Sequence, residues 1–121
     1  MNPLQNALKI NALFSIISGV TIILFNRQIA NLFGVSNQTI FIITGILLVF
    51  FSFTILYEIK RLRRLFVLWI IIQDCIWVVA SLLLIIYNPY NVSFVGNVII
   101  GVIAIIVLYM AINQYSKLRK Q

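Results

Sequence analysis

Residues 65–87, with the sequence LFVLWIIIQDCIWVVASLLLIIY, decide the fold of this chain. The run is apolar over the length that an α-helix needs to cross a bilayer core of about 30 Å, which is roughly 20 residues. It is too long and too uniformly apolar for the core of a small soluble domain. It therefore predicts a transmembrane helix, with one acidic residue, Asp74, in its middle.

Three other apolar segments have the length of a membrane span. They cover residues 4–25, 39–57 and 94–115, and short connections join them. No small-x-small cleavage site follows the first of them, so we expect it to be a retained helix and not a cleaved signal peptide. Short connections favour antiparallel packing of consecutive helices. The sequence thus predicts one all-α domain over residues 1–121, an integral membrane four-helix bundle with up-down-up-down topology.

The composition agrees with a membrane protein and excludes several other classes. Of the 121 residues, 63% are hydrophobic and only 9% are charged, and the mean hydropathy is +1.11. A soluble domain has about a quarter of its residues charged. The absence of His and the single Cys exclude the usual His/Cys metal sites, disulfides within the chain and His-based catalysis. We expect no metal, no cofactor and no enzymatic activity.

The basic residues give the expected orientation. The net charge is +7, and the Lys and Arg residues cluster beside the apolar runs, which indicates membrane topology and not nucleic-acid binding. With the N-terminus in the cytoplasm, one side of the membrane collects Lys9, Lys60, Arg61, Arg63, Arg64, Lys117, Arg119 and Lys120, while the other collects Arg27 alone. The positive-inside rule then predicts that both termini are cytoplasmic.

Two of the connections between the predicted spans have sequence patterns that predict contact with the membrane surface. Residues 28–34 place Ile29, Leu32 and Phe33 on one helical face, which predicts a short amphipathic turn in the outer headgroup layer, ended by Gly34. The inner connection holds Lys60, Arg61, Arg63 and Arg64. This cluster is interpreted as a positive-inside anchor, and it is also a candidate site for anionic lipid headgroups.

Asp74 is the main functional candidate because ionisable residues within membrane spans are costly and usually functional. No Lys or Arg is expected at its depth, which the count along its helix places near the bilayer midplane. Two alternatives follow: the carboxyl is protonated, or it faces a polar cavity that can hold water. As a third reading, a protonated Asp74 bonded to Ser or Asn serves only to fix the register of the helices.

Other polar residues are expected to share this site. Trp77 and Ser81 lie on the same helical face as Asp74, and Gln73 lies beside it. The first span has a polar stripe, of which Ser15 or Ser18 is expected at the depth of Asp74. The predicted ligand or proton site comprises Asn11, Ser15, Ser18, Gln73, Asp74, Trp77 and Ser81. The fourth span adds Asn113 and Gln114 at its inner end, while Gly19, Gly45 and Gly101 are small residues that permit close helix packing.

The chain resembles a group of small bacterial inner-membrane proteins without an assigned activity in three segments, INALFSIISG (residues 10–19), IANLFG (residues 29–34) and QDCIWVVAS (residues 73–81). The resemblance implies a four-helix fold in a bacterial cytoplasmic membrane and supplies no substrate. The chain differs from small multidrug-resistance transporters, whose coupling carboxylate is a Glu in the first span. Here that span has no acid.

These features lead to two functional hypotheses. The first is proton- or cation-linked transport or channel function centred on Asp74, in a homodimer or larger homo-oligomer, because one chain of four helices leaves little room for a path. The second is a non-catalytic role in binding a lipid or quinone-like molecule, or as an accessory membrane subunit. Membrane lipids are expected partners in both, nucleic acid in neither, and the small-molecule or ion ligand stays open.

Overall fold

The computed structural model describes residues 2–89 and 91–120, and within these ranges helices are joined by short turns and no strand is present. Four long helices are apolar enough to cross a membrane, which identifies the chain as an integral membrane protein by length and composition. The elements are α1 (Pro3–Leu24), α2 (Asn26–Phe33), α3 (Thr39–Ile59), α4 (Arg64–Tyr87) and α5 (Phe94–Arg119). They lie within a few residues of the predicted spans, although α5 continues beyond residue 115.

Local sequence signals explain where several helices begin and end. The Asn2 side chain accepts from the Gln5 amide at 2.8 Å, the Gln5 side chain accepts from the Asn2 amide at 3.1 Å, and Pro3 occupies the first helical position. This capping box satisfies amide groups that have no partner within α1. The predicted turn after the first span is a helix of two turns, α2, and Gly34 ends it with a left-handed φ of 71°.

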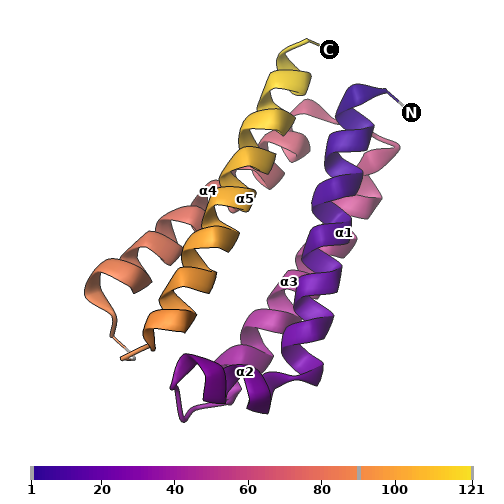
Figure 1. Ribbon diagram of the computed structural model, residues 1–121. Coiled ribbons are helices and arrows are strands. Elements are labelled where there is room, and N and C mark those ends of the chain that lie inside the picture. The colour runs from indigo at the N-terminus through magenta and orange to yellow at the C-terminus, as the bar shows by residue number, and fades with distance from the viewer. Residues whose placement is uncertain (1, 90, 121) are drawn as a thin grey trace.

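The long helices form two antiparallel pairs, α1 with α3 and α4 with α5 (Figure 1). Gly19 and Gly45 allow α1 and α3 to pack closely, since a Cβ at Gly19 would lie 2.8 Å from the Gly45 carbonyl oxygen. Gly101 has no such role, because a Cβ there would meet only Ile85, at 3.8 Å. Small residues at helix contacts are typical of membrane proteins.

The two pairs meet at one end of the molecule and diverge towards the other (Figure 1). We call the first the basic end, because it carries the α3–α4 connection with Lys60–Arg64 and the last turn of α5 with Lys117 and Arg119. The other is the α2 end. α3 and α4 contact each other little, so consecutive helices are not all packed side by side as one closed bundle would require.

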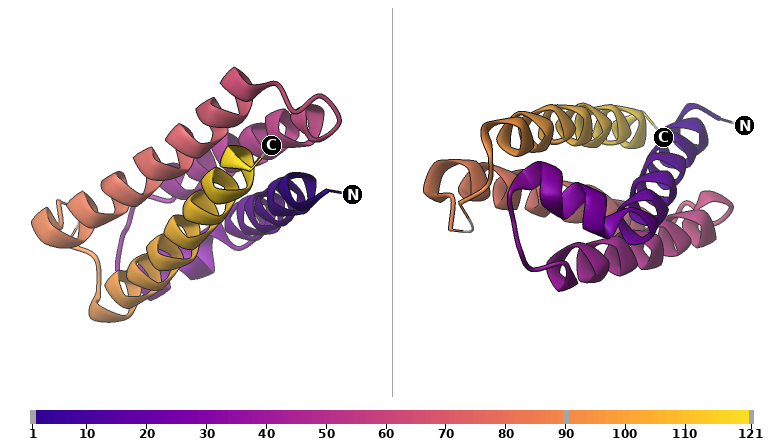
Figure 2. Two further views of the ribbon diagram at one scale, coloured as in Figure 1. Left: turned by 90° about the horizontal axis from the view of Figure 1, so that it is seen from above. Right: turned by 60° about the horizontal axis from the view of Figure 1, so that its bottom comes forward.

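The buried core occupies the basic end. Its largest fully buried apolar side chains are Leu4, Leu8, Ile55, Val67 and Ile70, contributed by α1, α3 and α4. At the α2 end, α2 lies across the gap between α5 and the α1–α3 pair (Figure 2).

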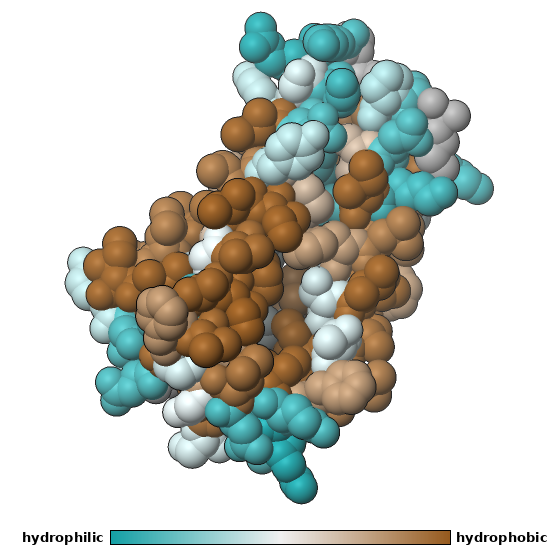
Figure 3. Space-filling model, in the orientation of Figure 1, coloured by the Kyte–Doolittle hydropathy of each residue, from teal (hydrophilic) through white to brown (hydrophobic). Residues whose placement is uncertain are grey.

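The exterior is more apolar than the surface of a soluble protein. Polar side chains gather at the two ends, and a belt of apolar side chains lies between them (Figure 3). Large side chains such as Phe50 and Ile105 are 68% and 69% exposed within this belt. Exposure of so much contiguous apolar surface is expected only where lipid, and not water, is the solvent.

Candidate functional site

Asp74 lies at the centre of a buried polar cluster that joins three helices. It comes from α4, Asn11 from α1 and Gln114 from α5, and none of the three side chains is more than 2% exposed. The Asn11 Nδ2 and the Gln114 Nε2 each lie 2.7 Å from Asp74 Oδ2, and both donate to it. Asn11 Nδ2 also donates to Gln114 Oε1 at 3.0 Å. The three residues therefore form a closed triangle of hydrogen bonds.

The outer bonds of the cluster fix which way its two amides face. Asn11 Oδ1 accepts from the Ser15 hydroxyl at 3.2 Å, and Gln114 Nε2 also donates to the Met110 carbonyl at 3.0 Å. Asn11 and Gln114 thus have every amide N–H and both carbonyl oxygens engaged. Each amide donates one N–H to Asp74, an arrangement that suits a carboxylate oxygen as the acceptor.

The two carboxyl oxygens of Asp74 differ. Oδ2 accepts both amide hydrogen bonds, whereas Oδ1 has no hydrogen-bond partner among residues 2–89 and 91–120. No basic side chain neutralises the carboxyl either, since within these ranges the one salt bridge joins Arg63 to Glu58. As the sequence predicts, Asp74 is a buried acid without a cationic partner. One of its oxygens is left to be satisfied from elsewhere.

The cluster separates the packed core from a cavity. On α1 and α4, the buried core extends from the basic end as far as Ala12 and Ile71. The cavity wall starts at about the same level, with Asn11 on α1 and Asp74 on α4. Counted at about 1.5 Å per residue, Asp74 lies roughly 15 Å from the start of α4, while Gln114 lies only about 8 Å from the end of α5. The cluster is therefore closer to the basic end than the count along α4 alone predicts.

The cavity occupies the space between the two diverging helix pairs and has a volume of about 500 Å³. This is within the usual size range of small-molecule sites. Its wall is mainly apolar, with Phe14, Phe51 and Ile103 among its larger side chains, and Asp74 is its one titratable residue among those described. A furrow on the face seen in Figure 3, between the α5 side and the α1 side, follows the same gap.

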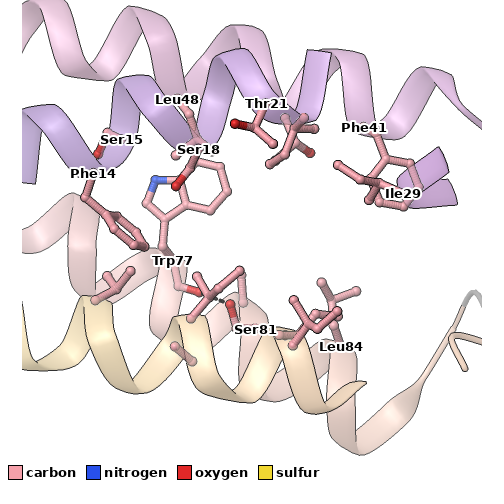
Figure 4. A pocket seen from close by; sticks show the side chains of 18 of the residues that line it. Phe14, Ser15, Ser18, Thr21, Ile29, Phe41, Leu48, Trp77, Ser81 and Leu84 are labelled. Atoms are coloured by element: carbon pink, nitrogen blue, oxygen red, sulfur yellow. Dashed lines mark hydrogen bonds between the residues drawn. The ribbon is translucent and has the colours of Figure 1, made fainter. Parts of the chain in front are cut away.

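A few polar groups other than Asp74 line the cavity. Trp77 and Ser18 come from facing helices, and the indole ring of Trp77 extends towards Ser18 (Figure 4). Neither the Trp77 indole N–H nor the Ser18 hydroxyl has a hydrogen-bond partner in the described parts of the chain. The Ser81 hydroxyl is already used, because it donates to the Trp77 carbonyl at 2.7 Å. Ser81 therefore contributes to the wall mainly by its small size.

Helix α2 covers the cavity at the end opposite to Asp74. Ile29, Leu32 and Phe33 lie in the wall, and the Ser93 backbone N–H and hydroxyl donate to the Phe33 and Leu32 carbonyls at 2.7 and 2.8 Å. These bonds attach the end of α2 to the start of α5. The apolar face predicted for this segment thus contacts the cavity, and its bonds connect the two helix pairs.

The structure brings together six of the seven residues predicted for the ligand or proton site. Asn11, Ser15, Ser18, Asp74, Trp77 and Ser81 all line the cavity, but Gln73 is absent from its wall. Asn11, and not Ser15 or Ser18, reaches the Asp74 carboxyl. Gln114 is not among the predicted site residues, because it lies near the end of the apolar run. The sequence signal for Gln114 is its polar amide at the inner end of a long apolar run.

The basic residues of the α3–α4 connection are not equivalent. Arg63 is bound to the buried Glu58, with Nε 3.1 Å from Oε1, and its guanidinium lies 3.9 Å from the centre of the Phe66 ring. The hydrogen bond to Glu58 raises the pKa of Arg63 above its ordinary value. Arg61 lies over Tyr57 at 4.5 Å. All four basic residues are exposed, but only Arg63 among them forms an ion pair with Glu58 in the described parts of the chain.

The comparisons with known proteins add no family. No protein-family model, no curated protein and no solved structure matches the chain. The function of this chain is therefore inferred from the geometry of its cavity. The resemblance to small bacterial inner-membrane proteins stays a prediction.

Proposed function

We propose that this chain is a non-catalytic integral membrane protein that binds a mainly apolar small molecule in the cavity between its two helix pairs. Asp74 recognises a polar group of that molecule. The observation that carries the proposal is the position of the carboxyl: two amides donate to Oδ2, Oδ1 has no partner in the described chain, and Asp74 forms part of a mainly apolar wall. A carboxyl oxygen at the wall of a mainly apolar cavity, without a partner in the described chain, is costly unless a ligand or water supplies the bond.

The ligand enters from the side, out of the lipid. α3 and α4 contact each other little, and the cavity lies between the pairs to which they belong. A lipid or quinone-like molecule has the required chemistry, namely an apolar body with a small polar head. Residues of a single chain line the cavity, so binding does not depend on a second copy.

The test compares two Trp substitutions in protein reconstituted into nanodiscs. Ser18→Trp fills the cavity, whereas Ile105→Trp adds the same side chain to the lipid-exposed side of α5. Native mass spectrometry of the wild type should detect a small molecule of defined mass, retained by Ile105→Trp and lost from Ser18→Trp. Equal ligand content in both variants would contradict the proposal.

A second candidate function is proton- or cation-linked transport through the same cavity. It is favoured by Asp74 being the one titratable group of the cavity wall among the described residues. The packed core around Leu8, Ile55 and Val67 lies between Asp74 and the basic end, so transport requires movement of the helix pairs. Proteoliposome flux that is abolished in Asp74→Asn supports this function, and unchanged flux removes it.

We further propose that the basic end faces the cytoplasm of a bacterium, with both termini inside and the protein in the inner membrane. The distribution of Lys and Arg supports this orientation. A homo-oligomer of two or more chains belongs to the transport hypothesis, in which it would widen the path. Anionic lipid headgroups at Lys60, Arg61 and Arg64 fit the same orientation.

A further inference from the structure

We infer that the ligand of the cavity is a lipophilic organic monocation, which binds in exchange for one proton on Asp74. This inference rests on the proposed function and specifies its ligand class. It follows from the direction of the hydrogen bonds, the charges around the cavity and the aromatic side chains in its wall. Each of these narrows the chemistry of the group that meets Oδ1.

The hydrogen bonds favour an anionic carboxyl. Asn11 and Gln114 both donate to Oδ2, and their carbonyl oxygens already accept bonds from Ser15 and Asn11. Two N–H donors at 2.7 Å stabilise a carboxylate more than they stabilise a carboxylic acid. The site is therefore prepared for a negative charge that no group of the described chain balances.

The surroundings of Asp74 limit the ligand to one positive charge. The side chains that face it from α1 and α5 are Asn11 and Gln114, and the wall residues of α2 and α3 include no titratable side chain. Lys9 on α1 and Arg27 on α2 are absent from the wall. A single carboxylate in a low-dielectric space is neutralised either by its own proton or by one cation.

Aromatic rings supply the second half of a cation site. Trp77 follows Asp74 by one helical turn, and both Trp77 and Phe14 extend into the cavity (Figure 4). The face of a Trp ring attracts organic cations, most strongly where water is excluded. A bulky cation with an apolar body therefore finds an anion, an aromatic face and an apolar wall in one cavity.

The exchange balances in atoms and charge. The Oδ1–H bond of the neutral acid breaks and the proton leaves to water, while the carboxylate forms an ion pair with the entering cation. No covalent bond forms with the ligand. The cavity is electrically neutral before and after the step, which avoids a bare buried charge.

The experiment measures binding of tetraphenylphosphonium to the wild type in nanodiscs by calorimetry, at several pH values and in two buffers of different ionisation enthalpy. We expect one proton released per cation bound, and an affinity that rises about tenfold per pH unit while Asp74 is protonated in the free protein. This proton count requires no variant. Binding without proton release would overturn the inference.

Variants and a neutral probe complete the test. Asp74→Asn should lose tetraphenylphosphonium binding by at least about tenfold, whereas Glu58→Gln, which removes the other acid of the chain outside the cavity, should keep it. Asp74→Glu should retain the proton exchange. Triphenylphosphine oxide, a neutral hydrogen-bond acceptor, should bind more weakly than the cation. Preferential binding of the oxide through Asp74 overturns the inference but leaves the proposed function intact.

Discussion

The Asn11 amide donates to the Asp74 carboxyl at 2.7 Å although α1 and α4 make no close backbone approach to each other. The two residues connect the two helix pairs across the point where the pairs begin to diverge. Gln114 closes the triangle from α5. The same cluster therefore holds the pairs together and presents Asp74 to the cavity.

Asn11→Ala should destabilise the protein because it removes a donor from Asp74 and the partner of Gln114 Oε1. Buried side-chain hydrogen bonds in membrane proteins contribute about 0.6 kcal/mol on average and up to about 1.7, and we expect the upper part of this range. Unfolding by SDS in mixed micelles measures the change. Ser52→Ala is the control, since Ser52 is fully buried but bonds only to the Val49 carbonyl of its own helix. Equal losses in the two variants would contradict a role in joining the pairs.

Gly45→Ala should weaken the α1–α3 pair. A Cβ at Gly45 would lie 2.5 Å from Ile23 Cγ1 and 2.7 Å from the Gly19 carbonyl oxygen, so the helices must separate. Overpacking of this kind costs about 1–3 kcal/mol. Gly101→Ala, with 3.8 Å to its nearest neighbour, should leave the SDS unfolding midpoint almost unchanged. An unchanged SDS unfolding midpoint in Gly45→Ala would show that α1 and α3 pack at a greater distance.

These packing details also show what the sequence can and cannot predict. The spans, the amphipathic α2 and the unpaired Asp74 follow from hydropathy and residue type alone. The division into two diverging pairs does not, because the lipid-exposed sides of the helices are as apolar as the buried sides and leave no amphipathic period to identify the packed face. The sequence predicts Gln114 at a membrane end for a related reason: the apolar run stops near it, while α5 continues to Arg119.

Ser93→Ala should loosen α2 from α5. The Ser93 hydroxyl donates to the Leu32 carbonyl and accepts from the Gly96 amide at 3.1 Å, so the change removes both a cross-link and an N-cap. Loss of an N-cap costs about 1 kcal/mol. Hydrogen exchange over residues 26–35 should become faster. Ser81→Ala, which removes a hydroxyl bonded within α4, should leave that exchange unchanged.

The basic residues of the α3–α4 connection should have two roles: Arg63 stabilises the fold, whereas Lys60, Arg61 and Arg64 bind lipid headgroups. Arg63→Gln leaves the buried Glu58 without its ion pair, so it should lower the thermal unfolding midpoint. Combined Gln substitution of Lys60, Arg61 and Arg64 should weaken binding of phosphatidylglycerol, measured by native mass spectrometry, and leave the midpoint nearly constant. The reverse pattern would assign the lipid contact to Arg63.

The orientation can be tested with an impermeant maleimide on intact bacterial cells that express the chain. Cys75 is the one native thiol, and Cys75→Ala provides a background without it. In that background, Gln28→Cys on α2 should be labelled from outside, whereas Lys120→Cys at the basic end should react only after the cells are permeabilised, because both positions are exposed but lie at opposite ends of the molecule. Labelling of Lys120→Cys in intact cells would reverse the orientation and place the Asp74 cluster nearer the outer surface.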